Sequence, residues 1–282
     1  MGDSRFPWGE RTAVMGVLNL TPDSFSDGGR FTRVARAVDA AGRMLAQGAD
    51  VLDLGAQSTR PGAEEVGPQR ELERLLPALR AISAAHPNAL LSIDTFHAAV
   101  AEAALEAGAH WINDVSGGRR DPAMLALAAA AGCPLVLMHS RGDSRSMDQL
   151  AHYDDVVAEV RTGLLEATEA ALATGVRAMQ LIWDPGLGFA KDTDHNLALL
   201  RGLALLAADG FPILVGPSRK RFIGAVLQEP RPRARLWGTA AVCSQAIAQG
   251  ARLLRVHDVG PIVQVARMAD ALKPGIRSGP RR

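Results

Sequence analysis

Residues 134–138 read PLVLM and residues 212–216 read PILVG, and in both runs apolar side chains follow one another without alternating polar positions. A strand of this kind is buried on both faces, which is typical of a parallel sheet covered by helices. Six further short runs of the same type occur along the chain. The eight predicted strands cover residues 13–20, 51–55, 90–94, 111–115, 134–139, 181–184, 213–216 and 253–257.

Longer segments, in which apolar residues recur every three or four positions, follow these strands and predict helices. They cover residues 34–46, 71–84, 98–107, 124–131, 154–173, 197–207, 237–248 and 259–271. Successive strand–helix units without a second zone of composition indicate an α/β protein with a single (β/α)8 TIM barrel. A doubly wound open sheet is the alternative. We expect one domain over residues 1–282, with a barrel core at about 13–272 and short polar termini.

The composition bounds the kinds of ligand that the protein can bind. Hydrophobic residues make up 48% of the chain and charged residues 22%, which is enough apolar material for a large core. The formal net charge is +1, so no broad basic surface for nucleic acid or membrane is expected. An anionic ligand therefore needs a local site. Only three of the 31 basic residues are lysines, so a lysine in a pocket would stand out.

Cysteine usage and the absence of long apolar runs predict the compartment. The two cysteines, Cys133 and Cys243, cannot form a disulfide framework. The polar start of the chain lacks a signal-peptide pattern, and no run of about 18 apolar residues occurs. We expect a cytoplasmic protein without a membrane segment.

Polar side chains stand where each predicted strand ends, which is where a barrel of this kind places its catalytic groups. One such residue is commonly a helix cap. Polar chemistry at all eight ends favours a functional site. The residues concerned are Asn19, the loop after residue 55, Asp94, Asn113 with Asp114, His139, Asp184, the segment 216–224, and Arg255 with His257.

Two strand ends combine to predict an anion site. Arg255 and His257 are two positions apart and so point to one face of their strand, and a predicted helix begins directly after them. Arg219, Lys220 and Arg221 follow the seventh strand, and barrels often bind phosphate after strands seven and eight.

Two loops after the first and second strands, TPDSFSDGG (21–29) and STRPGAEEVG (58–67), are longer and more polar than ordinary turns, which predicts mobile lids. Their oxygen-bearing side chains, together with Asn19, suit Mg²⁺ that shares a phosphate. No pair of His or Cys has zinc spacing, and neither a P-loop nor a dinucleotide fingerprint occurs. These residues indicate transfer of a heterocyclic group from a diphosphate ester.

Eight strings, each at a strand end and in the right order, resemble the dihydropteroate synthase family of pterin-binding barrels. The resemblance runs from about residue 13 to about residue 270. The strings are MGVLNLTPDSFSDGG, DLGAQSTRPGA, LLSIDT, INDVSGG, LVLMH, DPGLGF, SRKRFIG and RVHDV.

The resemblance implies a transferase of tetrahydrofolate biosynthesis. It would condense 6-hydroxymethyl-7,8-dihydropterin diphosphate with 4-aminobenzoate to give 7,8-dihydropteroate and pyrophosphate. Mg²⁺ is the implied cofactor, the family is commonly homodimeric, and sulfonamides compete with 4-aminobenzoate. Loss of pyrophosphate would leave a resonance-stabilised pterin methylene cation. The neutral arylamine can attack that cation without a base, so His139 is expected to be structural.

The resemblance also implies a role for each site residue. Asn19 contacts Mg²⁺ and the diphosphate, and the catalytic residues are Asp94, Lys220, Arg255 and His257. The pterin is held by Asp94, Asn113, Asp184 and Lys220, the diphosphate by Arg255 and His257, both substrates by Thr59 and Arg60, and 4-aminobenzoate by a pocket of Phe25, Asp27 and Pro61.

Three positions depart from the usual pattern of that family. Ala56 and Gln57 stand in place of the common Gly-Glu, which changes the hinge and the charge of the second loop. Arg221 stands where many members have Ser, near the carboxylate of 4-aminobenzoate. A guanidinium could still serve that carboxylate.

Two other functions fit part of the pattern. A methyltetrahydrofolate–corrinoid methyltransferase-like barrel would use Asp94, Asn113 and Asp184, but it needs neither a diphosphate clamp nor lids for Mg²⁺. A non-catalytic pterin-binding paralogue is expected to have decayed loops. The intact first loop, Lys220 and the Arg255/His257 pair favour the synthase.

Overall fold

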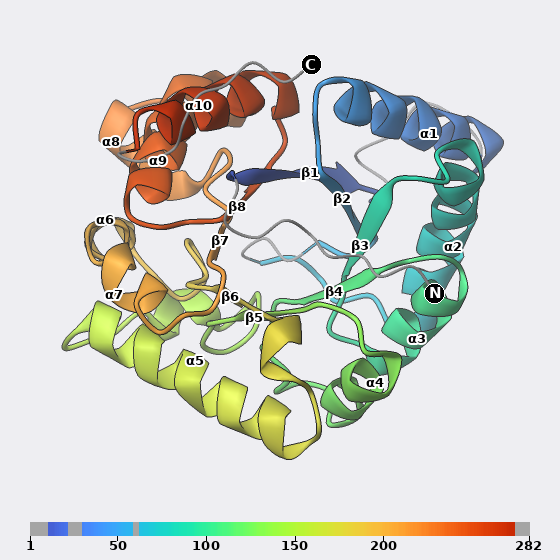
Figure 1. Ribbon diagram of the computed structural model, residues 1–282, viewed down its shortest axis with the longest axis horizontal. Helices are drawn as coiled ribbons and strands as arrows, with labels where there is room; N and C mark the ends of the chain where they lie inside the picture. The colour runs from blue at the N-terminus through green and yellow to red at the C-terminus, as the bar shows by residue number, and fades with distance from the viewer. Residues whose placement is uncertain (1–10, 22–29, 59–61, 274–282) are drawn as a thin grey trace.

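The computed structural model describes residues 11–21, 30–58 and 62–273, and its strands form a ring inside a layer of helices (Figure 1). All neighbouring strands are parallel, in the order β6-β5-β4-β3-β2-β1-β8-β7. A parallel bridge between Trp183 and Ile213 links the two ends of this order. The expected barrel is therefore confirmed. The strands are β1 Ala13–Asn19, β2 Val51–Gly55, β3 Leu90–Asp94, β4 Trp111–Asp114, β5 Leu135–Met138, β6 Leu181–Asp184, β7 Leu214–Val215 and β8 Leu253–Val256.

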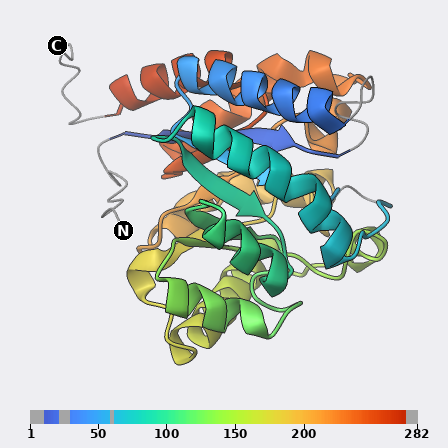
Figure 2. The same cartoon turned by 90° about the vertical axis from the view of Figure 1, so that its right-hand side faces the viewer.

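The helices lie outside the strands, and Figure 2 shows α1 and α2 covering one side of the sheet. Within the described residues no helix is long and apolar enough to cross a membrane. The helices are α1 Arg30–Ala46, α2 Pro68–Ala85, α3 Ala98–Glu106, α4 Ala123–Ala131, α5 Val156–Ala173, α6 Thr193–Arg201, α7 Leu203–Ala207, α8 Arg221–Leu227, α9 Leu236–Ala248 and α10 Val259–Ala271.

One predicted helix was wrong. The segment 197–207 is split at Gly202 into the end of α6 and α7. A Cβ atom at Gly202 would lie 2.8 Å from Val157 Cγ2, so the backbone approaches α5 more closely than a side chain allows. The sequence analysis also missed α8 because its seven residues follow directly on the polar end of β7.

Side chains of alternate strand residues fill the inside of the barrel. At the amino-terminal end of the strands this filling is apolar, and its members are Ala13, Met15, Val51, Trp111, Val136, Ile182, Leu214 and Leu253. Two positions further along, on the same face, stand Asp53, Asn113, Asp184 and Arg255. The apolar layer thus closes the barrel from below, and buried polar groups lie at its mouth.

Aspartate side chains cap the two helices that follow β5 and β6 beside the mouth. Asp155 begins α5 by accepting hydrogen bonds from the backbone amides of Val157 and Ala158, and Asp192 begins α6 in the same way. The loop residues 22–29 and 59–61 lie outside the described part of the chain. The predicted site residues Phe25, Asp27, Thr59, Arg60 and Pro61 fall there.

Candidate active site

Arg255 joins two carboxylates inside the barrel mouth. Its Nε donates to Asp53 Oδ2 and its Nη2 donates to Asp94 Oδ2, each over 2.6 Å. Burial by itself would lower the pKa of Arg255, but Asp53 and Asp94 raise it above its usual value, so the guanidinium stays charged. Burial raises the pKa of Asp94, and Arg255 counteracts that shift. Strand β8 therefore supplies a fixed cation to carboxylates of β2 and β3.

Asp53 is a site residue that the sequence analysis missed. It lies in the middle of β2 and is fully buried, and its Oδ2 also accepts a hydrogen bond of 3.0 Å from Asn113 Nδ2. That bond fixes the orientation of the Asn113 amide. The signal in the sequence was a charged residue inside the apolar run VLDLG, on the inward face shared with Val51 and Gly55.

Two carboxylate oxygens at the mouth have no hydrogen-bond partner among the described residues. They are Oδ1 of Asp53 and Oδ1 of Asp94, and both are buried. Buried polar atoms in native proteins nearly always find a partner. A ligand with N–H donors would supply one here.

Asp184 and Lys220 form the opposite side of the mouth. Asp184 Oδ1 accepts a hydrogen bond of 2.7 Å from the Gly186 amide, and burial raises the pKa of this carboxyl. Burial also lowers the pKa of Lys220 to about 8, although Asp184 acts in the other direction. The Lys220 Nζ lies 4.2 Å from the centroid of the Phe189 ring.

Asn19 and His257 meet at the ends of β1 and β8. The Asn19 Nδ2 lies 3.5 Å from His257 Nε2, and His257 Nδ1 lies 2.9 Å from Ser218 Oγ. Three or more His, Cys, Asp or Glu side chains that could hold a metal ion do not come together in the described ranges. Asn19 offers one amide oxygen at this corner, and an oxygen of this kind is a ligand that Mg²⁺ accepts beside phosphate and water.

Arg219 and Arg221 already bind carboxylates of this chain. Arg219 donates to both oxygens of Asp258 over 3.0 and 2.7 Å, and Arg221 donates to both oxygens of Asp148 over 3.1 and 2.6 Å. Of the three basic residues after β7, Lys220 is the one that lies beside Asp184. Of the predicted basic cluster, Arg219 and Arg221 therefore form ion pairs within the chain, and Lys220 lies at the mouth.

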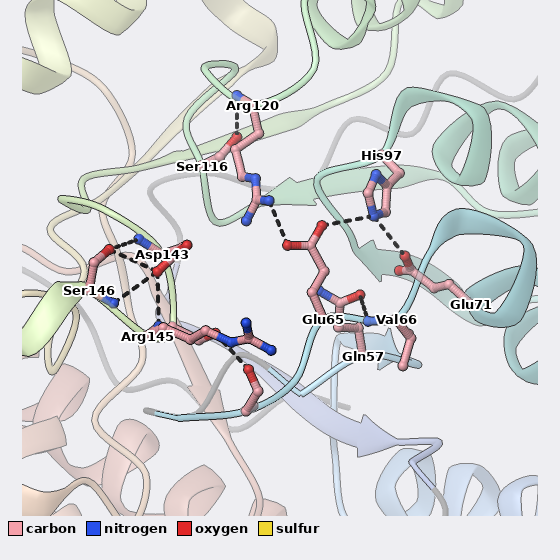
Figure 3. Close-up of polar contacts among 12 residues, drawn as sticks. Gln57, Glu65, Val66, Glu71, His97, Ser116, Arg120, Asp143, Arg145 and Ser146 are labelled. Carbon is pink, nitrogen blue, oxygen red and sulfur yellow. Dashed lines mark hydrogen bonds and ion pairs between the residues drawn. The ribbon is translucent and has the colours of Figure 1, made fainter.

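The base of the second loop is held by a chain of polar contacts (Figure 3). Arg120 donates to Glu65 over 2.6 Å, and His97 Nε2 lies 3.7 Å from Glu65 and 4.0 Å from Glu71. Burial raises the pKa of Glu71 to about 7. The Gln57 side chain accepts a hydrogen bond of 3.3 Å from the Val66 amide, so the residue that departs from the family pattern joins the two ends of this loop.

His139 does not stand as a free base. Its Nδ1 lies 3.1 Å from Lys191 Nζ, and burial together with Lys191 lowers its pKa to about 2. It is therefore neutral, with its ring fixed by a neighbouring ammonium. This placement agrees with the expected structural role.

Comparison with known proteins gives one family over nearly the whole chain. The family described as pterin binding enzyme matches residues 15–257. The dihydropteroate synthase of Synechocystis sp. is 48% identical over 272 residues, which cover 96% of this chain and 94% of that protein. The dihydropteroate synthase structure from Clostridium difficile, determined with pteroic acid, has a TM-score of 0.89 at 40% identity and covers 95% of this chain and 98% of that one. The Xanthomonas albilineans enzyme with 4-aminobenzoic acid has a TM-score of 0.88 at 43% identity, covering 94% of each chain.

Proposed function

Because this chain belongs to the pterin binding enzyme family and is a dihydropteroate synthase, a transferase, we propose that it condenses 6-hydroxymethyl-7,8-dihydropterin diphosphate with 4-aminobenzoate for tetrahydrofolate synthesis. The observation that carries this proposal is the buried mouth in which Arg255 joins Asp53 and Asp94 and faces Asp184 and Lys220. Such a mouth combines carboxylate acceptors for a nitrogen heterocycle with cations for an anion.

The carboxylates recognise the pterin ring in this account. The amino-amide edge of a pterin donates parallel hydrogen bonds, which a carboxylate accepts in a fixed orientation. Asp184 is assigned to that edge, and the unpartnered Oδ1 of Asp94 to another ring N–H. The Asn113 oxygen, turned by Asp53, completes the pocket. A ring without these donors would leave buried oxygens unpaired and would be rejected.

The corner of β1 and β8 is assigned to the diphosphate. Arg255 uses Nε and Nη2 for carboxylates, so Nη1 is its donor for the anion, and His257 follows directly after β8, two residues from Arg255. Asn19 would hold Mg²⁺, which when bound neutralises charge on the departing pyrophosphate.

The residues of the chain need to orient the reactants rather than to activate a nucleophile. The bond between the pterin methylene carbon and the diphosphate oxygen breaks, and its electron pair leaves with pyrophosphate. The amine nitrogen of 4-aminobenzoate forms the new bond to that carbon and then loses a proton. Lys220, with a pKa of about 8, is mostly an ammonium at pH 7 and holds the ring beside Asp184.

The second substrate is assigned to the loops. Thr59 and Arg60 would reach toward both substrates, and Phe25, Asp27 and Pro61 would form the 4-aminobenzoate pocket. Arg221 would receive the substrate carboxylate by releasing Asp148, which is feasible because both partners of this ion pair are more than half exposed. Sulfonamides, which carry the same arylamine, would compete for this pocket.

The proposal includes a cytoplasmic homodimer built from one domain per chain. Large apolar side chains are exposed on α8, α9 and α10, with Trp237 79% and Met268 60% exposed. Exposed apolar surface of this kind is typical of a protein interface. Both cysteines are free and buried, as a reducing compartment permits.

Pyrophosphate release tests the reaction. We expect release when both substrates and Mg²⁺ are present, and only background release when 4-aminobenzoate or Mg²⁺ is left out. Background release from the complete mixture would overturn the proposal.

A further inference from the structure

Lys191 is a buried lysine near the mouth, and no step of the proposed reaction uses it. Its side chain is 5% exposed, and its Nζ meets three acceptors. They are His139 Nδ1 at 3.1 Å, the Phe189 carbonyl at 2.9 Å and the His139 carbonyl at 3.4 Å. An ammonium has three N–H donors, so each of them has a partner.

These contacts tie the loop between β6 and α6 to the end of β5. The loop contains Gly186, Gly188 and Ala190, with φ angles of 67°, 74° and 50°, a region that costs energy for residues with a side chain. A Cβ atom at Gly186 would lie 1.9 Å from the His139 carbonyl oxygen, so loop and strand end are in close contact. Such a backbone conformation persists when surrounding contacts stabilise it. Lys191 supplies contacts to both the loop, at Phe189, and the end of β5, at His139.

Phe189 of the same loop lines a cavity and contacts Lys220. Phe189 presents its carbonyl to Lys191 and its ring to Lys220, 4.2 Å from the Nζ. With Val115, Phe96 and Met147 it also lines a cavity of about 50 Å³ that reaches Gln57 and Glu65 at the base of the second loop. The loop begins at Asp184, which is assigned to the pterin. A displacement of Phe189 would therefore change the surroundings of both Asp184 and Lys220.

We propose that Lys191 is a positioning residue of the pterin pocket, which holds the Phe189 ring against Lys220 through the Phe189 carbonyl. That this pocket binds a pterin rests on the proposed function.

Lysine suits this position better than arginine does. The space offers three acceptors around one nitrogen, whereas a planar guanidinium has five donors and a wider fork. Burial lowers the pKa of Lys191 to about 7, which Asp184 counteracts, while Lys220, Arg141 and Arg119 repel the charge. In a chain with 28 arginines and three lysines, two lysines lie at this mouth, Lys191 buried and Lys220 partly buried.

A double-mutant cycle tests the inference, with pteroic acid binding measured by calorimetry. We expect Lys191→Met to weaken binding about tenfold, which lies between the effects of an exposed and a desolvated cation–π contact, and Phe189→Leu to weaken it similarly. Because Lys191 acts through Phe189, the double variant should bind as Phe189→Leu does.

The KM for 4-aminobenzoate should stay within about twofold in all three variants. Lys273→Met is the matched control, since Lys273 pairs with Asp270 and makes no contact with Phe189, and it should bind normally.

Additive losses, or a Lys191→Met variant that behaves like Lys273→Met, would overturn the inference. If Lys191→Met does not fold, lysine labelled at Cε gives three signals in the wild type, assigned with Lys273→Met and Lys220→Met. Pteroic acid should shift the signals of Lys191 and Lys220 and leave that of Lys273 in place. An unmoved Lys191 signal would also overturn the inference. Failure of the wild type to bind pteroic acid would instead count against the proposed function.

Discussion

Arg255 Nε and Asp53 Oδ2 form a hydrogen bond of 2.6 Å across 202 positions of the sequence, inside the barrel. The bond requires β8 and β2 to lie on either side of β1 in the sheet. It also orients the site, since the same Asp53 oxygen binds Asn113. One carboxylate oxygen therefore binds both Arg255 of β8 and Asn113 of β4, which the proposed function assigns to the pterin.

Replacing that carboxylate should reduce both stability and binding. Asp53→Asn removes the charge that faces a buried guanidinium, and we expect a loss of about 3 kcal/mol in the free energy of unfolding and weaker pteroic acid binding. Denaturant unfolding and calorimetry measure the two effects. Asp209→Asn is the control, because Arg161 in that pair is 47% exposed, and it should cost less than about 1 kcal/mol. Equal losses in the two variants would contradict the role of Asp53.

Glu71 should make stability depend on pH. Its pKa is about 7 in the folded protein and 4.5 in an unfolded chain, so its contribution is fully present below pH 4.5 and is lost as the pH rises through 7. Glu65, Asp94, Arg74 and His97 are the charged or titratable neighbours. Glu71→Gln should therefore gain stability relative to the wild type between pH 5 and 8, by at most about 3 kcal/mol. A difference in the free energy of unfolding that stays constant over this range would show that Glu71 does not titrate there.

Gln57 should affect the second substrate more than the fold. Gln57→Ala removes the acceptor of the Val66 amide, and we expect the KM for 4-aminobenzoate to rise several-fold while the melting temperature changes little. Gln57→Glu keeps an acceptor and should retain most of the wild-type KM. If both variants raise the KM equally, the hydrogen bond to Val66 is not what orders the loop.

Asp148 should compete with the carboxylate of 4-aminobenzoate for Arg221. Asp148→Asn should lower the KM for 4-aminobenzoate by about two- to threefold, because an exposed ion pair is worth less than about 1 kcal/mol. The effect should vanish when Arg221 is replaced by Ser. An unchanged KM in Asp148→Asn would remove Arg221 from the carboxylate site.

The barrel could be predicted because each of its eight strands is a short apolar run that can be recognised from local sequence. Side-chain contacts between elements far apart in the sequence could not be predicted in this way. Asp94, Asn113, Asp184 and Arg255 stand in the last two positions of their strands and Lys220 stands in the loop after β7, and the structure brings them to one mouth. Asp53 and Lys191 were missed because their importance lies in partners 202 and 52 positions away. The break at Gly202 was missed for the same reason, since it depends on the approach of α5.

Pteroic acid binding to Asp184→Asn is the most direct test that this mouth holds a pterin. The substitution keeps the shape of the side chain and one acceptor for the Gly186 amide, but it replaces a charged, two-oxygen acceptor. We expect the wild type to bind one equivalent and the variant to bind about 100-fold more weakly with an unchanged melting temperature. Equal affinities in the two proteins by calorimetry would contradict this expectation.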